Sequence, residues 1–394
     1  MAILAVNAGS SSLKFAVHPC PQGQVQQAVL TGTVQGLEPG GVPDMTWQQG
    51  NNARQTRPLP RVSQGFDQAL QALHALLDTT HASAQLQAVA HRVVHGGAQY
   101  RTSVRITPAV LQDLQALQPL APLHQPHNLA GIQAFAQAFP ALPQIACFDT
   151  AFHGTMDEVN STYALPQMLT AQGVRRYGFH GLSYQFVMSA LLARSPRAQG
   201  RVLMAHLGNG ASLCAARAGH SCATTMGFSA LEGLMMGTRA GSLDPGVLLY
   251  LLEQGWTPAR LQDMLYRQSG LLGVSGISAD MRRLRADASA PARRAIALFT
   301  HRVVRESGGL SACLGGLDVL AFSGGIGEHD TALRAEVCAA LAYLGVHLDP
   351  QRNAQATGNA TVAVHADQSA VEVWVVPTDE GVVAAREAAA LLGV

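Results

Sequence analysis

The chain has almost no lysine. Its 394 residues include 26 Lys and Arg together, and Lys14 is the only lysine among them, so arginine carries nearly all of the positive charge. With 25 Asp and Glu the formal net charge is +1, which provides no basic face for nucleic acid or for an anionic membrane. Charged residues make up 13% of the chain and hydrophobic residues 48%, a composition that favours a globular protein with a large core over a disordered one.

Long apolar runs and paired cysteines are also missing. No apolar stretch approaches the length of a membrane-spanning helix, and the N-terminus has no basic segment or cleavage site of a secretory signal. We therefore expect a soluble, cytoplasmic protein with no membrane or nucleic-acid partner. The histidines form no His-Glu-x-x-His pattern, and no Cys-x-x-Cys pair occurs. We expect reduced thiols at the six scattered cysteines: Cys20, Cys147, Cys214, Cys222, Cys313 and Cys338.

Short apolar runs alternate with longer amphipathic stretches along the chain. The runs predict strands at residues 3–6, 13–17, 88–94, 144–148, 201–206, 213–216, 318–323 and 371–376. The stretches predict helices at 66–77, 129–138, 184–193 and 292–314. This order indicates an α/β protein with mixed sheets, and the length suggests roughly two or three domains. The arginines between 282 and 294 are expected on a solvated helix face.

One segment is echoed half a chain later. Residues 3–9 form an apolar strand and a small-residue turn, followed by Ser12 and Leu13. Residues 202–208 repeat this order and are followed by Ser212 and Leu213. The echo predicts a duplicated domain in which two hairpin loops hold one polyphosphate.

Gly-rich turns follow three of the predicted strands, at residues 7–15, 206–212 and 322–329. They match neither the Walker loop nor the Gly-x-Gly-x-x-Gly fingerprint. Each alone reads as a tight structural turn, whereas three at strand ends favour nucleotide binding, because glycine lets backbone N–H groups approach an anion. Lys14 lies beside the first turn, where a compact ammonium group suits a phosphate; the alternative is an ordinary solvated lysine.

Several polar side chains follow strands or stand among small residues. Arg92 ends an apolar run and Arg239 lies in a Gly-rich stretch, so either could clamp an anion or form a structural ion pair. Asp149 follows a buried strand, the usual place for a carboxylate that positions a metal. His180 lies between Gly178 and Gly181, although a lone histidine is more often a core residue. Glu380 begins the last helix, where an acidic residue is also common for structural reasons.

Taken together, these motifs closely resemble the acetate kinase family, in order from residue 3 to residue 381. The matching segments are 7–15, 91–97, 148–153, 177–181, 206–212, 226–228, 231–233, 237–241, 242–245, 324–328 and 377–380. The resemblance implies a duplicated actin-like (ASKHA, ribonuclease H-like) two-lobed α/β fold with an active-site cleft between the lobes, and a homodimer. It also implies reversible, direct in-line transfer of the γ-phosphoryl group of ATP to acetate, with Mg²⁺ or in its place Mn²⁺. The N-terminal lobe would comprise 1–150 with 381–394, and the C-terminal lobe 151–380.

The family pattern also assigns roles to residues of this chain. Asn7 and Glu380 would hold the metal, and the catalytic residues would be Asp149, His180 and Arg239. Arg92 would bind the substrate carboxylate, and the acyl pocket would be lined by Val94, Leu123, Phe179 and Ala230. The nucleotide would contact Lys14, His206, Leu207, Gly208, Asn209, Gly210, Asp280, Met281, Arg282, Gly325, Ile326, Gly327, Glu328 and His329.

One of these roles needs a physical qualification. A substrate carboxylate is already ionised at pH 7, since carboxyl pKa values lie near about 4, so no proton has to be removed from it. We therefore expect Asp149 to organise Mg²⁺, its waters or Arg92, and not to act as a general acid or base.

The chain departs from the family pattern at four places. His329 replaces the usual Asn, Tyr184 a usual His, and Ala230 a common Pro, and residues 124–128 also differ. Ala230 enlarges the predicted acyl pocket while Val94 still limits it, so we expect acetate to be preferred over propionate. The competing interpretations are a propionate kinase or broader short-chain carboxylate kinase, an actin-like sugar kinase with Asp149 as its base, and a non-catalytic ATP-driven clamp or filament.

Overall fold

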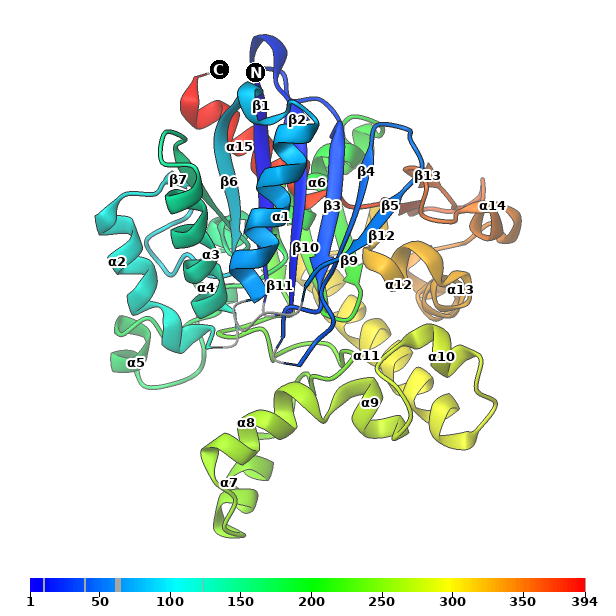
Figure 1. Ribbon diagram of the computed structural model, residues 1–394. Helices are drawn as coiled ribbons and strands as arrows, with labels where there is room; N and C mark the ends of the chain where they lie inside the picture. Colours follow the sequence, from blue (N-terminus) through cyan, green and yellow to red (C-terminus); the bar gives the residue numbers. More distant parts are fainter. Residues whose placement is uncertain (10, 39, 61–64, 123, 394) are drawn as a thin grey trace. The chain divides into compact units, whose positions relative to one another are not determined.

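The computed structural model describes all of the chain except residues 10, 39, 61–64, 123 and 394. The described residues divide into two compact units, one formed by Met1–Ala151 with Asp379–Val394 and the other by Phe152–Thr378. The sequence prediction placed the divisions at 150/151 and 380/381. Each unit is built on its own mixed β-sheet with helices packed against it (Figure 1).

The first unit has its strands in the order β5-β4-β3-β2-β1-β6-β8-β7. The strands are β1 (Ala2–Ala8), β2 (Ser12–Pro19), β3 (Leu30–Gln35), β4 (Asp44–Gln49), β5 (Gln55–Pro58), β6 (Leu86–Val93), β7 (Val104–Arg105) and β8 (Gln144–Phe148). The helices are α1 (Gly65–Thr79), α2 (Pro108–Ala116), α3 (Gln125–Ala138) and α15 (Glu380–Leu392). Strands β1, β6 and β8 run parallel, so their carboxyl ends meet at one edge of the sheet.

The two faces of this sheet are covered by different helices. Leu4, Phe15 and Leu73 belong to one buried cluster between the sheet and α1, which crosses in front of β1 and β2 in Figure 1. On the other face the Sγ of Cys147 lies 3.7 Å from the backbone oxygen of Ala384 in α15. Successive side chains of a strand point to opposite faces, so each strand divides its residues between the α1 face and the α15 face.

The second unit has the strand order β11-β10-β9-β12-β14-β13. The strands are β9 (Arg201–Leu207), β10 (Ala211–Arg217), β11 (His220–Thr224), β12 (Val319–Ser323), β13 (Val362–Ala363) and β14 (Glu372–Val375). The longer helices are α6 (Gly181–Leu192), α7 (Pro245–Glu253), α8 (Pro258–Arg267), α11 (Ala290–Leu314) and α13 (Thr331–Ala340). The short ones are α4 (Glu158–Ser161), α5 (Gln167–Ala171), α9 (Gly270–Ser275), α10 (Met281–Arg285), α12 (Gly324–His329) and α14 (Pro350–Gln355).

Two helices sandwich this second sheet. Tyr184, Val187 and Met188 of α6 are buried with Met204 and Cys214 on one face. Helix α11 contacts β9, β10 and β11, and its small and apolar residues are buried along its length. An amphipathic pattern with a 3.6-residue period produces this arrangement, because it directs one stripe of the helix to the sheet.

The two sheets share a common strand plan. In each, an antiparallel hairpin (β1–β2 or β9–β10) is followed by two parallel strands, β6 and β8 or β12 and β14. The orders β3-β2-β1-β6-β8 and β11-β10-β9-β12-β14 therefore correspond strand by strand. The predicted duplication is confirmed at the level of topology.

The predicted strands and helices are present, but the solvated helix face predicted for residues 282–294 is wrong. The eight predicted strands and four predicted helices all fall in strands and helices of the structure. The stretch 282–294 is not a single solvated face: α10 ends at Arg285, whose side chain is only 26% exposed and pairs with Asp330 and Glu336. Within the described ranges, no helix is both long and apolar enough to cross a membrane.

Candidate active site

A row of polar side chains crosses the first sheet where its parallel strands end. Lys14 lies directly opposite Asn7, and β1 is paired with β6 in the register Val6 to His91, which places Asn7 beside Arg92. Val6 packs in the core on the α1 face, so the next residue, Asn7, points to the α15 face. Lys14 and Arg92 share that face by the same alternation. The pairing therefore gathers three residues that the sequence analysis had selected separately.

Arg92 makes a bidentate ion pair in this row. Its Nε donates to Oδ1 of Asp149 at 3.0 Å and its Nη2 donates to Oδ2 at 2.6 Å, a bidentate pair. Its Nε also lies 3.4 Å from Oε2 of Glu380, at the start of α15. Three of the seven predicted site residues of this unit, Arg92, Asp149 and Glu380, thus form one cluster. One guanidinium faces two carboxylates, so the cluster has a formal charge of −1.

Burial and charge act in opposite directions on this pair. Burial would lower the pKa of Arg92, but the charges of Asp149 and Glu380 raise it above its ordinary value. Burial raises the pKa of Asp149, which is almost fully enclosed, while Arg92 opposes that rise. Both oxygens of Asp149 accept hydrogen bonds from the guanidinium, which is the geometry of an ionised pair.

Asn128 is a residue of this region that the sequence analysis missed. Its Oδ1 accepts from the backbone N–H of Val94 at 3.0 Å, and its Nδ2 donates to the backbone oxygen of Ala8 at 2.9 Å. This buried amide on α3 thereby ties the end of β6 to the end of β1. Val94 is buried beside it, and Leu123 lies outside the described residues. No local pattern marks Asn128, because its partners are 34 and 120 residues away along the chain.

In the second unit, two histidines lie face to face. The rings of His180 and His206 are stacked with centroids 4.3 Å apart and planes 28° apart. Nδ1 of His180 is 2.8 Å from Oγ of Ser212, and Nδ1 of His206 is 2.8 Å from Oγ of Ser183. His180 has a φ of 60°, a left-handed conformation that is strained for a residue with a side chain.

The loop between β9 and β10 brings this pair to an arginine. A Cβ on Gly210 would lie 3.2 Å from Nε2 of His180 and 3.6 Å from Nη2 of Arg239, so glycine keeps the space between those nitrogens open. Nη1 of Arg239 donates to the backbone oxygen of Ala230 at 3.0 Å. Phe179, next to His180, is buried. His180 and Arg239, which were predicted to stabilise the charge of the transferred group, therefore both lie beside Gly210.

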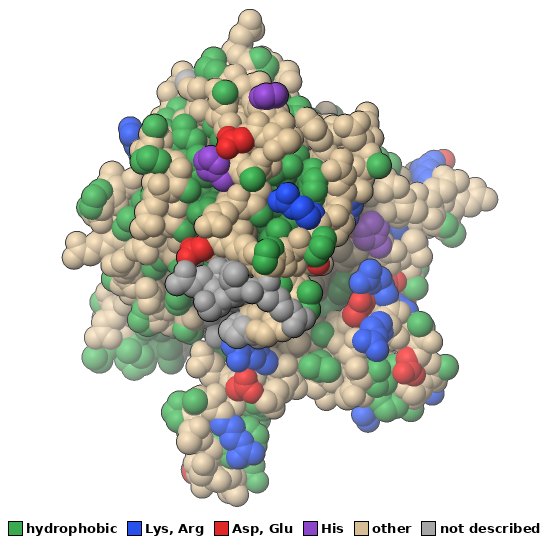
Figure 2. All heavy atoms as spheres, viewed as in Figure 1, with side chains coloured by type: hydrophobic (Ala, Val, Ile, Leu, Met, Phe, Trp, Pro, Cys, Tyr) green, Lys and Arg blue, Asp and Glu red, His purple; other side chains and the backbone are tan. Residues whose placement is uncertain are grey.

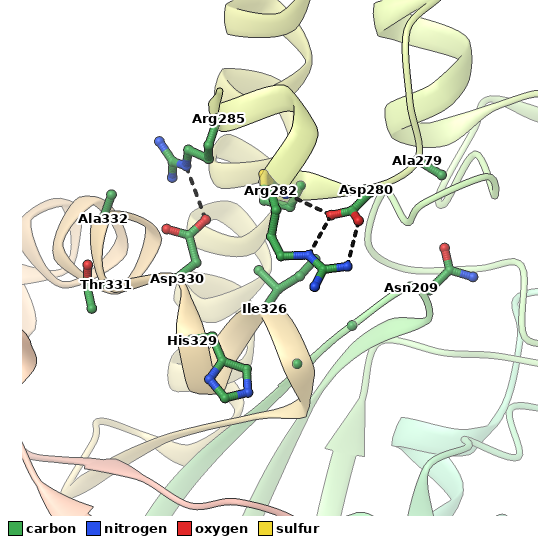
Figure 3. A pocket seen from close by; sticks show the side chains of 13 residues that line it. Asn209, Ala279, Asp280, Arg282, Arg285, Ile326, His329, Asp330, Thr331 and Ala332 are labelled. Carbon is green, nitrogen blue, oxygen red and sulfur yellow. Dashed lines mark hydrogen bonds and ion pairs between the residues drawn. The ribbon is translucent and has the colours of Figure 1, made fainter. Parts of the chain in front are cut away.

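The same unit contains a pocket of about 960 Å³ (Figure 3), within the size range of ligand sites. It is lined by Gly208, Asn209, Ala279, Asp280, Met281, Arg282, Arg285, Gly325, Ile326, His329, Asp330, Thr331 and Ala332. Eight of these were predicted nucleotide contacts. Ala279, Arg285 and Asp330–Ala332 were missed, since nothing in their local sequence sets them apart. The predicted contacts Lys14, His206, Leu207, Gly210, Gly327 and Glu328 are not among the lining residues.

Two arginine–aspartate pairs line this pocket, as Figure 3 shows. Arg282 donates through Nε and Nη2 to Asp280 at 3.1 and 2.7 Å, and hydrogen bonds from Arg282 lower the pKa of Asp280. Arg285 donates through Nε to Asp330 at 3.1 Å. The first pair is exposed and contributes little to stability. It is therefore better placed to meet a ligand than to hold the fold.

Helix α12 forms the wall of the pocket between these pairs. Oε1 of Glu328 accepts from the backbone N–H groups of Gly324 at 2.8 Å and Thr378 at 3.2 Å. Burial raises the pKa of Glu328, and those two bonds oppose the rise. Glu328 thus accepts a hydrogen bond at the start of its own helix, and the residues of α12 that line the pocket are Gly325, Ile326 and His329.

These features define a class of protein. A duplicated α/β fold, with glycine-rich loops at strand ends, a ligand pocket in one unit and an ordered arginine–carboxylate cluster in the other, is that of a two-lobed phosphotransferase of the ASKHA type. The family model described as "Acetokinase family" matches residues 2–386, and the chain belongs to that family.

Relatives of known name agree over almost the whole chain. The acetate kinase of Rhodopseudomonas palustris (strain ATCC BAA-98 / CGA009) is 50% identical over 390 residues, covering 98% of this chain and 96% of the relative. The propionate kinase of Citrobacter rodentium (strain ICC168) is 40% identical over 398 residues, covering 98% and 95%.

Solved structures give the same result for the fold. That of a propionate kinase from Francisella tularensis subsp. tularensis SCHU S4 has a TM-score of 0.89 at 35% identity, with 98% of each chain covered. That of Porphyromonas gingivalis acetate kinase has a TM-score of 0.87 at 35% identity, with 99% covered. The predicted fold and family are confirmed.

Proposed function

We propose that this protein is an acetate kinase, which reversibly transfers the γ-phosphoryl group of ATP to acetate and yields acetyl phosphate and ADP. Family membership supports a phosphotransferase with a carboxyl acceptor. The pairing of Arg92 is the observation that supports a carboxylate as the phosphoryl acceptor. A guanidinium has five N–H groups, and Asp149 engages two of them. The remaining three suit a second carboxylate, that of the substrate.

The acceptor we propose is a short-chain acid, because Val94, two residues after Arg92, is buried and limits the acyl pocket. Val94 is buried next to the arginine strand, and we assign it, with Phe179 and Ala230, to the acyl group of the substrate. One methylene is worth about 1–3 kcal/mol of discrimination in such a pocket. Acetate is therefore the first substrate and propionate the second.

The second unit supplies the phosphoryl side of the reaction. We assign the Figure 3 pocket to ATP and ADP, and the space beside Gly210 to the transferred phosphoryl group. His180 and Arg239 both face that space and stabilise the charge of the transition state. An arginine in this role contributes roughly 10³–10⁵ in rate. Direct transfer requires this phosphoryl group to meet the carboxylate held by Arg92.

Asn7 and Glu380 fit a magnesium ion. Amide and carboxylate oxygens are ligands that Mg²⁺ takes, usually one or two of them together with water and substrate phosphates. In the described residues no three His, Cys, Asp or Glu side chains gather as a metal cage, which agrees with a site completed by nucleotide and water. Bound Mg²⁺ would neutralise phosphate charge, and Mn²⁺ offers similar chemistry.

The geometry argues against a sugar kinase. A hydroxyl acceptor needs a general base, and Asp149 would have to supply one oxygen for it. Both oxygens of Asp149 are paired with Arg92, and the residue is only 1% exposed, so it is poorly placed to take a proton from an incoming hydroxyl. An anionic acceptor needs no base, so the observed pair suits a carboxylate and leaves Asp149 to orient the arginine.

The assembly and location also belong to this proposal. Helix α7 exposes Val247, Leu249, Tyr250 and Leu252, and hydrophobic side chains reach the surface over α7 and α8 in Figure 2. Such a patch favours a homodimer over a monomer. We place the enzyme in the cytoplasm, where ATP and acetate are available.

One assay tests the reaction. Protein, Mg-ATP, a carboxylate and hydroxylamine are mixed, and acyl hydroxamate is measured. We expect the acetate product with a higher kcat/KM than the propionate product. Equal or reversed values would favour a propionate kinase, and no hydroxamate from any short-chain acid would overturn the proposed function.

A further inference from the structure

A buried chain of hydroxyl groups ends on His180. Oη of Tyr184 lies 2.5 Å from Oγ of Ser212, and the same Oγ lies 2.8 Å from Nδ1 of His180. Tyr184 and Ser212 are both fully buried. Tyr184 stands where the family pattern has a histidine, so this chain has its own chemistry at that position.

The direction of the hydrogen bonds from Tyr184 through Ser212 to His180 decides which ring nitrogen of His180 carries the proton. Ser212 has one hydroxyl hydrogen and lies between two partners. If Tyr184 donates to Ser212, then Ser212 donates to Nδ1, and the neutral imidazole carries its hydrogen on Nε2. If the chain runs the other way, Nδ1 is protonated and Nε2 becomes an acceptor.

The surroundings of Tyr184 favour the first order. Burial raises the pKa of this phenol well above its ordinary value, so the hydroxyl keeps its proton and has to donate it. Oγ of Ser212, at 2.5 Å, is the side-chain partner that the hydrogen bonds of the described residues give to this hydroxyl. A fully buried O–H needs an acceptor, so Tyr184 donates its hydrogen to Ser212.

We propose that Tyr184 and Ser212 are positioning residues that hold His180 in the Nε2–H form. In this form His180 presents a hydrogen-bond donor to the space beside Gly210, where Nη2 of Arg239 also points. An oxygen of a phosphoryl group needs donors, so the opposite form would turn a lone pair toward it. The value of this donor for catalysis rests on the proposed function, whereas the position of the proton does not.

A second serine–histidine pair offers a matched control. Ser183 of α6 bonds His206, and Ser212 of β10 bonds His180, so the two hydrogen bonds cross between the same helix and hairpin. Both serines are fully buried, and the two rings are stacked. Removing Ser183 therefore causes a similar local loss without touching the Tyr184–Ser212–His180 chain.

Nuclear magnetic resonance of the ¹⁵N-histidine-labelled protein, without substrate and at pH 8, reads the proton position directly. We expect His180 to be in the Nε2–H form in the wild type and in Ser212→Thr, which keeps a hydroxyl. Tyr184→Phe and Ser212→Ala should give mixed forms at His180, and Ser183→Ala should change only the His206 signals. A wild-type Nδ1–H form, or an unchanged His180 in folded Tyr184→Phe, would overturn the proposal.

Kinetics provide the second readout. Partners that fix a histidine's proton are worth roughly 10–100-fold in activity. Tyr184→Phe should therefore lower kcat by that factor and leave both KM values within about twofold, because it removes one buried oxygen and no ligand contact. If the wild type makes no acyl phosphate, the proposed function fails, while the proton position of His180 is still tested by the spectra. Equal kcat in wild type and Tyr184→Phe would contradict a positioning role.

Discussion

At the scale of single residues, the chemistry of the first unit depends on one arginine that two carboxylates hold in place. Arg92 could be selected from sequence because it ends an apolar strand, and Asp149 because it follows another. Their bidentate pairing could not, since the two residues are 57 positions apart and meet only when β6 and β8 lie side by side. The structure also shows Glu380 against the same guanidinium, which links the predicted metal ligand to the carboxylate site.

We predict that Asp149→Asn lowers kcat by roughly 100-fold or more while the protein stays folded. An asparagine has one acceptor oxygen, and its NH₂ group would face an N–H of the guanidinium, so the bidentate pair is lost and Arg92 loses its orientation. Because Asp149 is not assigned a proton transfer, the pH profile of kcat should keep the same limbs. Comparing kcat against pH for both proteins checks this, and a wild-type limb that vanishes in the variant would show that Asp149 acts as an acid or base.

Gly210 provides a second test at this scale. A methyl group there would lie 3.2 Å from Nε2 of His180 and 3.6 Å from Nη2 of Arg239, in the space we assign to the phosphoryl group. Gly210→Ala should therefore reduce kcat by at least about tenfold, a barrier increase of about 1.4 kcal/mol, with little change in thermal stability. Gly309→Ala is the control, because no atom lies within 4 Å of a Cβ at that position. Full activity of the Gly210 variant would rule out this placement.

At the scale of secondary-structure elements, the pocket that we assign to the nucleotide depends on a six-residue helix that is too short to be stable alone. Arg334 of α13 is fully buried and supports α12 from its carboxyl end. Its five N–H groups donate at 2.8 to 3.0 Å to the backbone oxygens of Gly327, Glu328, Asn353 and Ala356 and to Oδ1 of Asn353. The cation thus lies where the carbonyl groups at the ends of α12 and α14 converge, a favourable place for positive charge.

We predict that Arg334→Met destabilises the protein by about 3 kcal/mol or more, because five buried acceptors lose their donors together. Arg352→Met should lower the free energy of unfolding far less. Arg352 lies in α14 and pairs with Asp367, but its side chain is 44% exposed. Urea unfolding of both variants measures the difference. Binding of ADP by the folded variants gives a second value, and we expect weaker binding only for Arg334→Met. Equal losses of stability would argue against the role given to the buried guanidinium.

At the scale of the whole molecule, stability should depend on pH through buried neutral histidines. Burial lowers the pKa of His91, His95 and His153 from 6.5 to about 4 in each case. Between these two values the unfolded chain binds protons that the folded chain does not, so the free energy of unfolding rises with pH. The stabilisation is complete above about pH 6.5 and is lost progressively as the pH falls toward 4.

We therefore predict a loss of about 1.4 kcal/mol for each of these histidines between pH 7.5 and 5.5. Urea unfolding at the two pH values measures the sum. His91→Gln, which removes one titrating group from beside Gln144, should reduce the pH dependence by about one third of that sum. A free energy of unfolding that is constant over this range would contradict the assignment of neutral buried rings.

The sequence by itself predicted eight of the strands, four of the helices, the duplicated plan and the glycine-rich loops, because these depend on local periodicity and on residues that lie close together in the chain. It also identified Arg92, Asp149, His180, Arg239 and Glu380 as chemical groups. The tertiary structure alone decided which of them meet; it added Asn128, Arg285 and Arg334, and it gave Tyr184 and Ser212 their partners. The physical reason is that a hydrogen bond joins neighbours in space: the partners of these added residues lie on other strands and helices, and no local pattern of residues encodes that proximity.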